Sequence, residues 1–181
     1  FHSHPYTSPE AQAKVEKLAE ILAAYGLGGY LNIIPFTKVQ QQIREKSPEA
    51  YLTLMMRICM MKIANMTARG INSKCLITGE SLAQVASQTV ENLTVTNSYA
   101  EFPVFRPLIG LDKEEITIEA KEIGTYETSI LPYEDCCVMF SPKHPILHSN
   151  LKDAAEIFER MEIDGLLEEA YAQREVKKMS F

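Results

Sequence analysis

The sequence predicts an α/β fold of the doubly wound type, in which helices cover both faces of a mostly parallel sheet. Three short segments, residues 30–36, 74–79 and 104–110, have the composition of β-strands, and each is bounded by glycine or proline. Segments with helical periodicity lie between them. Strands that alternate with helices are typical of a parallel sheet, and ligands bind such sheets at the carboxyl ends of the strands.

The helical segments are expected at residues 9–25, 38–44, 48–69, from about Ser81 onwards, 112–124, 151–161 and 164–175. Ser8 or Thr7 is a candidate cap for the first helix, and Pro9 is well tolerated at the first helical position. Segment 48–69 is rich in methionine, leucine and isoleucine, which indicates deep burial. The helix at 112–124 has an acidic first turn, which complements the helix dipole.

The composition suits one domain over residues 1–181. Hydrophobic residues make up 46% of the 181 residues, charged residues make up 23%, and the net charge is -6. This charge disfavours a protein that binds nucleic acid through a large basic surface of its own. No apolar run reaches the ~18–20 residues of a membrane span, and no signal peptide is visible. Four cysteines are too few for a disulfide framework at this length and fit a reducing cytoplasm.

Several candidate functional residues follow from the strand-end rule. Gly79 ends a predicted strand, and it would let a ligand approach the backbone closely. Gln88 lies in the helix predicted to follow, whose first amides could hold an anion. The alternative is an ordinary strand–helix turn capped by Ser81. Arg57 interrupts an apolar helix and therefore needs a charged ligand, a partner or access to solvent. Lys113 gains nothing from the dipole in a first turn, but an exposed surface lysine is the simpler interpretation.

Metal binding is not favoured by the pattern of histidines and cysteines. His2 and His4 have no further ligands at usable spacing, and Cys136 and Cys137 are adjacent rather than paired as C-x2-C. A disulfide between neighbouring cysteines is strained. This leaves Cys136 and Cys137 open as a sulfur-handling pair or as small buried side chains. The two remaining cysteines, Cys59 and Cys75, are expected to lie in the core.

Four long motifs resemble the tRNA 4-thiouridine synthetases, the tRNA sulfurtransferases also linked to thiamine thiazole synthesis. They are FHSHPYTSPEA at residues 1–11, TGESLAQVASQTVENL at 78–93, FPVFRPLIGLDKEEI at 102–116 and EIGTYETSILPYEDCCVMFSPKHP at 122–145. The resemblance covers the chain from end to end and is weaker after Leu151. Four motifs in the family order are far more specific than one glycine pattern.

The resemblance implies a PP-loop ATP pyrophosphatase domain, with ATP and accompanying Mg²⁺, and tRNA as a partner. ATP would adenylate O4 of a uridine in the position 8 region, and a persulfide sulfur would then displace AMP. The family's nucleotide contacts carry over to Phe1, Arg57, Gly79 and Gln88. Lys113 matches a lysine implicated in activity. Cys136 matches the cysteine thought to release sulfur from a persulfide by forming a disulfide.

The sequence departs from the family pattern in its missing parts. The Ser-Gly-Gly-x-Asp-Ser pyrophosphate loop and the RNA-binding THUMP region are absent from the printed sequence, and both are expected upstream of Phe1. We therefore expect residues 1–181 to be the C-terminal portion of the domain and to have little activity alone. No rhodanese domain is present, so a cysteine desulfurase or another protein would supply the persulfide. A homodimer would cover the hydrophobic edge left by an incomplete sheet.

Two alternatives remain at this point. The chain could belong to a PP-loop enzyme that adenylates a small molecule or another RNA base. It could also be a non-catalytic module that has lost its pyrophosphate loop.

Overall fold

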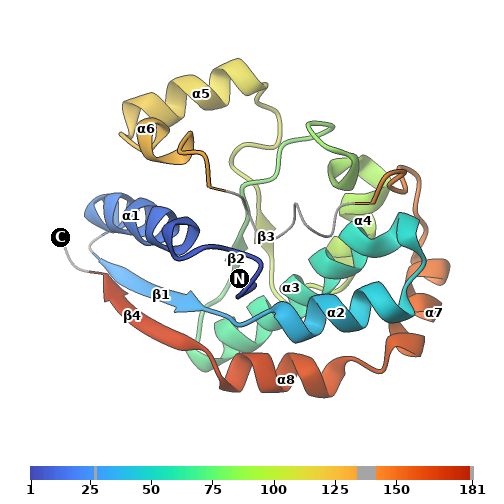
Figure 1. Ribbon diagram of the computed structural model, residues 1–181. Helices are drawn as coiled ribbons and strands as arrows, with labels where there is room; N and C mark the ends of the chain where they lie inside the picture. The colour runs from blue at the N-terminus through green and yellow to red at the C-terminus, as the bar shows by residue number, and fades with distance from the viewer. Residues whose placement is uncertain (27, 134–141, 180–181) are drawn as a thin grey trace.

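The computed structural model describes residues 1–26, 28–133 and 142–179 and has an α/β architecture (Figure 1). Its elements in chain order are α1 (Pro9–Tyr25), β1 (Gly29–Ile33), α2 (Thr37–Lys46), the 3-10 helix η1 (Glu49–Tyr51), α3 (Leu52–Gly70), β2 (Leu76–Ile77), the 3-10 helix η2 (Ala86–Gln88), α4 (Val90–Ser98), β3 (Val104–Phe105), α5 (Lys113–Glu122), α6 (Tyr126–Ser129), α7 (Leu151–Met161), α8 (Asp164–Ala172) and β4 (Glu175–Met179). The predicted fold class is thus confirmed at the level of α/β.

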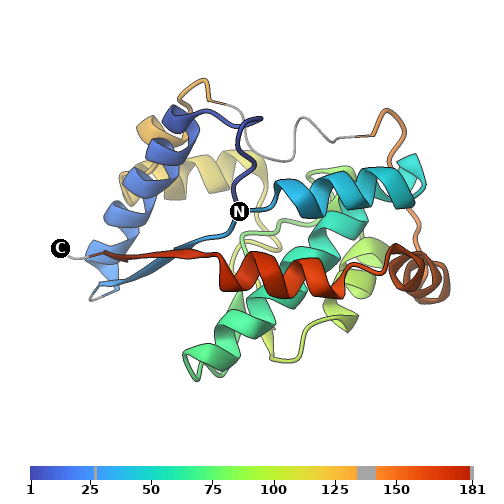
Figure 2. The same cartoon turned by 60° about the horizontal axis from the view of Figure 1, so that its bottom comes forward.

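The strands form two small sheets. β2 and β3 pair in parallel, with Leu76 opposite Val104 and Ile77 opposite Phe105. β1 and β4 pair antiparallel along their full lengths, and α1 lies beside this ribbon in both views (Figures 1 and 2). The parallel arrangement was predicted for β2 and β3. The antiparallel ribbon corrects the prediction, because residues 30–36 are predicted to join the parallel sheet and no strand is predicted after the helix at 164–175.

The first helix begins as the sequence predicts. The Ser8 hydroxyl accepts a hydrogen bond from the amide of Ala11 at 3.2 Å, and Pro9 occupies the first helical position. After the helix, Gly28 has a φ of 88°, a backbone conformation that glycine adopts without the steric cost of a Cβ. This turn reverses the chain into β1.

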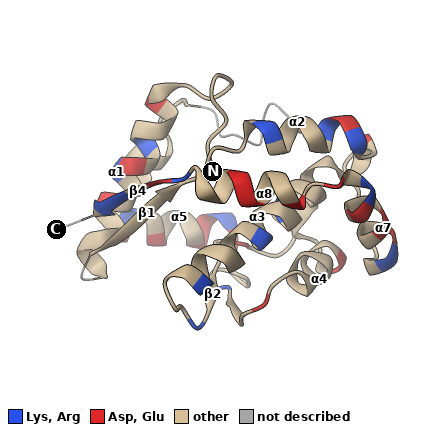
Figure 3. Ribbon diagram, turned by 90° about the horizontal axis from the view of Figure 1, so that it is seen from below, with Lys and Arg blue, Asp and Glu red and all other residues tan. Residues whose placement is uncertain are grey.

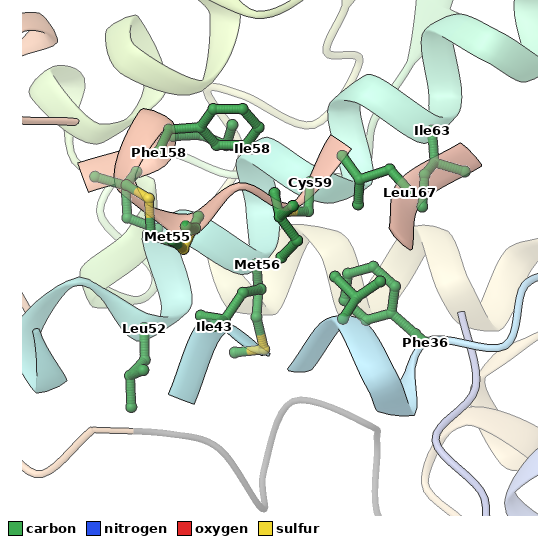
Figure 4. Packing of buried hydrophobic residues seen from close by; sticks show 14 of the residues in the cluster. Phe36, Ile43, Leu52, Met55, Met56, Ile58, Cys59, Ile63, Phe158 and Leu167 are labelled. Carbon is green, nitrogen blue, oxygen red and sulfur yellow. The ribbon is translucent and has the colours of Figure 1, made fainter. Parts of the chain in front are cut away.

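Helix α3 is the centre of the hydrophobic core (Figure 4). Its side chains at Met55, Met56, Ile58 and Cys59 are at most 1% exposed. They pack in one cluster with buried residues of α2, α7 and α8. The predicted deep burial of this methionine-rich helix is confirmed, and it gives the site described below a rigid base.

Truncating the core should be costly. We expect Ile58→Ala to lower the free energy of unfolding by about 2–5 kcal/mol, because the substitution loses buried methyl groups and leaves a cavity. The matched control is Ile118→Ala on α5, where the side chain is 56% exposed; its cost should stay within about 0.5 kcal/mol. Urea unfolding of the intact protein measures both, and equal costs would contradict this account of the core.

The start of one predicted helix is wrong. Residues 81–85 form no helix, and α4 begins only at Val90, where the Thr89 hydroxyl accepts from the amide of Asn92 at 3.2 Å. Helical periodicity from Ser81 had suggested an earlier start. Tertiary hydrogen bonds to the segment after β3 hold this stretch as a turn instead, since the amide of Leu82 donates to the carbonyl of Ile109.

The charged residues are spread over the molecule. Figure 3 shows Lys and Arg interspersed with Asp and Glu along α1, α2 and α7. Among the described helices, none has the length and apolar character needed to cross a membrane.

Candidate functional site

The carboxyl ends of β2 and β3 lie side by side and define the candidate site. The amide of Thr78 donates to the carbonyl of Phe105 at 3.0 Å, so the parallel pairing continues one step beyond β2. Gly79 and Glu80 follow on one strand, and Arg106 follows on the other. Because both strands run in the same direction, the side chains after them converge at one edge.

Glu80 forms ion pairs with two arginines at this edge. Its Oε1 pairs with Nη2 of Arg57 from α3, and its Oε2 accepts from Nε of Arg106 at 2.6 Å. The Glu80 side chain is 5% exposed, and those of Arg57 and Arg106 are 20% and 15% exposed. Two guanidinium charges and one carboxylate charge leave this cluster with a net charge of +1. The partner that Arg57 was predicted to need is therefore Glu80.

Further polar groups hold the cluster in place. The Thr78 hydroxyl donates to Oε2 of Glu80 at 2.7 Å. The Asn97 side-chain oxygen accepts from both Nη1 and Nη2 of Arg106 at 3.2 Å. Burial lowers the pKa of Arg106, but an arginine stays protonated at neutral pH. The cluster therefore keeps its excess positive charge under ordinary conditions.

The turn after Gly79 is built by hydrogen bonds within it. Oε1 of Gln88 accepts from the amide of Ser81 at 3.3 Å, and the main-chain carbonyl of Gln88 accepts from Ala83 at 2.9 Å. Because the amide oxygen of Gln88 faces the turn, its nitrogen is the end of the group suited to donate to a ligand. The alternative interpretation, a turn in which Ser81 caps a helix, is wrong, because the Ser81 hydroxyl donates to the carbonyl of Leu111 at 2.7 Å.

Packing does not explain the glycine at position 79. A Cβ placed on Gly79 would meet no atom of the described residues within 4 Å, and its φ lies outside the left-handed region. Neither crowding nor backbone strain requires glycine here. A bound group that approaches the main chain would supply such a requirement.

Lys113 is tied to the same turn through its own helix. It is the first residue of α5, and Asp112 before it forms a capping box with Glu115. The side chain of Lys113 is exposed. Since Ser81 bonds to Leu111 just before the cap, the turn after Gly79 and the start of α5 are joined. The predicted helix start at this position is confirmed.

Phe1 and β2 border the same cavity. The cavity has a volume of about 300 Å³, and its lining includes Phe1, Ile34, Ile63, Cys75 and Ile77. The ring of Phe1 meets the ring of Phe36 edge to face, with 4.9 Å between centroids. The structure thus brings Arg57, Gly79 and Gln88 to one turn, and Phe1 borders the same cavity as the strand that leads into this turn.

The two adjacent cysteines, Cys136 and Cys137, lie outside the described residues. Hydrogen bonds anchor the described chain on either side of this segment, at Tyr133 and at Lys143. The carbonyl of Tyr133 accepts from Nζ of Lys14 at 2.7 Å, and the amide of Lys143 donates to the Glu49 carboxylate at 3.3 Å.

The other two cysteines are free thiols. Cys59 is fully buried on α3, and burial raises the pKa of its thiol far above the ordinary value, so it is unreactive. The prediction of a core position is confirmed for Cys59. Cys75 is only half-buried and borders the cavity, so that prediction is wrong for Cys75.

The rings of His2 and His4 lie close together. Their ring centroids are 6.4 Å apart, and burial lowers the pKa of His2. His2 is also part of the fold, because its amide donates to the carbonyl of Ile34 at 2.9 Å. In the part of the chain that the structure describes, no group of three or more His, Cys, Asp or Glu side chains could hold a metal ion.

Sequence reasoning missed Arg106 and did not single out Glu80 as the partner of Arg57. Glu80 directly follows the strand predicted at residues 74–79, so the strand-end rule that selected Gly79 could have found it. Arg106 could not be found in this way, because it lies inside the strand predicted at 104–110, whereas β3 ends at Phe105. The rule does not show which of the charged residues meet, because Arg57, Glu80 and Arg106 come from three separate elements.

One protein family and several known proteins are similar to this chain. The model of the thiamine biosynthesis protein (ThiI) family matches residues 1–163. A probable tRNA sulfurtransferase of Treponema pallidum is 53% identical over 174 residues, which is 96% of this chain and 43% of that relative. A probable tRNA sulfurtransferase of Clostridium kluyveri is 53% identical over 97% of this chain and 46% of that relative.

A solved structure matches as well. It is a crystal structure of a 4-thiouridine synthetase–RNA complex with bound ATP, and it superimposes with a TM-score of 0.93 at 39% identity. The match covers 99% of this chain and 47% of that one. The chain thus spans about half the length of the relatives that it matches.

Proposed function

Because the chain belongs to the ThiI family, we propose that it is the C-terminal portion of the ATP-using domain of a tRNA sulfurtransferase. The observation that carries the proposal is the position of Arg57. A charged side chain from the apolar core helix reaches the turn after Gly79, at the strand ends where α/β proteins bind ligands. The family relationship then indicates which ligand this edge would take.

The proposed ligand is ATP, held by Phe1, Arg57, Gly79 and Gln88. Gly79 would permit close approach of the nucleotide to the main chain, Gln88 would donate from its amide nitrogen, and Arg57 would neutralise a phosphate. The similar crystal structure of a 4-thiouridine synthetase with bound ATP supports the choice of nucleotide. Mg²⁺ would enter with the phosphates of ATP, because no cluster of side chains among the described residues fits a resident metal ion. None of the proposed steps depends on this ion.

The proposed reaction has two stages. O4 of a tRNA uridine, in the position 8 region, attacks the α-phosphate of ATP, and pyrophosphate leaves. A persulfide sulfur then attacks C4, and AMP leaves with the former O4. Lys113 would stabilise negative charge that develops on the transferring phosphate. The Cys136 thiolate would attack the donor sulfur, form a disulfide with the donor and release 4-thiouridine; a thiol reductant then restores Cys136.

The doubly wound sheet is proposed for the longer protein. Among the described residues β2 pairs only with β3, and Ile77 on β2 is 70% exposed beside the apolar cavity that also borders Phe1. We place an upstream strand, followed by the pyrophosphate loop, between β2 and the strand end at His2. Alternatively, a second copy of the protein could cover this exposed edge of β2 in a homodimer. The mass of the full-length protein in solution distinguishes the two arrangements.

The proposed partners follow from the same chemistry. The substrate is tRNA, which the similar structure supports through its bound RNA. A cysteine desulfurase or another persulfide protein would donate the sulfur, which could also serve thiamine thiazole synthesis. A cytoplasmic location would provide tRNA and keep thiols such as Cys59 and Cys75 reduced.

Complementation tests the proposed function. A strain that lacks its own 4-thiouridine synthetase should regain 4-thiouridine in its tRNA when it expresses the intact protein that contains this chain. Expression of residues 1–181 alone should restore less than about 1% of that level, because the β- and γ-phosphates of ATP would lack their cradle. Thiolation is measured by mass spectrometry of tRNA nucleosides. Failure of the intact protein, or activity on a small molecule instead, would overturn the proposal.

A further inference from the structure

We propose that Glu80 and Arg106 are positioning residues, which hold the Arg57 guanidinium in place for an anionic phosphate group of the nucleotide. The inference rests on the proposed function and extends it to two residues for which the resemblance implied no role. It follows from the way in which one buried carboxylate joins two arginines.

The contacts form a chain that runs from β3 to α3. The Asn97 oxygen accepts from both terminal nitrogens of Arg106, and Nε of Arg106 donates to Oε2 of Glu80. The other oxygen of Glu80 pairs with Arg57. The three nitrogens of Arg106 thus bond to protein groups, which assigns Arg106 to orientation rather than to direct contact with a ligand.

The hydrophobic core holds the main chain of Arg57 in place. Its neighbours Met56 and Ile58 are at most 1% exposed, so helix α3 cannot rotate to move the arginine. Glu80 then decides where the guanidinium at the end of the long side chain lies. An arginine that is already in position loses less conformational freedom when it binds a phosphate.

The charge of the cluster supports an anionic ligand. If Glu80 faced Arg57 alone, the pair would be neutral. Arg106 adds a second positive charge, so the three side chains together carry +1 in a largely buried place, where electrostatic interactions are stronger than in water. One negative charge from a phosphate would balance the cluster.

The experiment measures binding of ATP and of uncharged adenosine to the intact protein. We expect Arg106→Gln to weaken ATP binding by about tenfold, which is the usual effect of losing one charge-assisted hydrogen bond. The affinity for uncharged adenosine should stay within about twofold of the wild-type value. Arg106→Lys keeps the charge but cannot reproduce the guanidinium contacts with both Glu80 and Asn97, so it should recover only part of the ATP affinity. In an Arg57→Gln background, Arg106→Gln should have a clearly smaller effect than in the wild-type protein, since Arg106 acts in part through Arg57.

Two further variants guard against a general loss of structure. Asn97→Ala removes the outer anchor of Arg106 without a change of charge, and it should weaken ATP binding by about threefold with the same selectivity over adenosine. Arg69→Gln is the matched control on α3, because Arg69 pairs with Glu101 at the exposed surface, where both side chains are 52% exposed. It should leave both affinities unchanged.

The outcomes separate this inference from the proposed function. Equal weakening of ATP and adenosine binding, or an equal effect of Arg106→Gln with and without Arg57, would overturn the positioning role alone. If Arg106→Gln fails to fold, the Asn97→Ala result decides: unchanged ATP affinity would contradict the role. A wild-type protein that binds no ATP would overturn the proposed function and this inference together.

Discussion

Lys113→Ala in the intact protein should lower the rate of 4-thiouridine formation by about 100-fold or more, the usual cost of removing a group that stabilises transition-state charge. Lys113 is exposed at the start of α5, and the capping box of that helix is made by Asp112 and Glu115. The substitution therefore removes a positive charge without loss of packing or of the cap. Single-turnover thiolation of tRNA measures the rate.

The control for Lys113→Ala is Lys152→Ala. Lys152 also lies in the first turn of a helix, α7, and its side chain is 84% exposed. It should keep full activity, and both variants should unfold at the wild-type temperature. Full activity of Lys113→Ala would remove this lysine from the mechanism. A parallel fall in activity and in unfolding temperature would indicate a structural role instead.

Cys136→Ala should reduce thiolation by about 100-fold, because a thiolate is needed as the nucleophile in sulfur exchange and alanine supplies none. Cys137→Ser should keep at least about half of the wild-type rate, since the proposed chemistry uses one thiol. Both residues lie outside the described part of the structure, so this prediction depends on the sequence and on the family relationship.

The adjacent cysteine makes Cys137→Ser a close control, because it changes the same segment by one atom. Mass spectrometry of the protein after a single turnover without reductant adds a second measurement. It should find Cys136 in a disulfide with the donor protein. Equal tolerance of both substitutions, with no such disulfide, would return the pair to a role in packing.

Local signals in the sequence were sufficient for most helices. The Ser8–Pro9 start of α1, the apolar composition of α3 and the acidic start of α5 each depend on residues within a turn or two of one another. Where the local signal competed with distant contacts, the prediction was wrong. The turn at 81–85 is held by the segment after β3, and β4 depends on its pairing with β1.

The residues of the candidate site likewise fall into those that the sequence indicates and those that only the tertiary structure brings together. Arg57, Gly79 and Lys113 could be selected from the sequence, because a charge in an apolar helix, a glycine at a strand end and a lysine in a first turn each conflict with their local surroundings. Their partners could not be selected, since no spacing rule links Arg57 to Glu80 or Glu80 to Arg106. These pairs arise only when α3, β2 and β3 pack together.

The amino-acid order alone thus establishes the α/β class, the buried methionine-rich helix and the family, because periodicity, capping and motif order are local properties of the chain. Folding in three dimensions determines which charges meet. Glu80 joins Arg57 and Arg106 because parallel strands end at one edge and α3 packs against them, and a contact between residues far apart in the sequence exists only once those elements are in place.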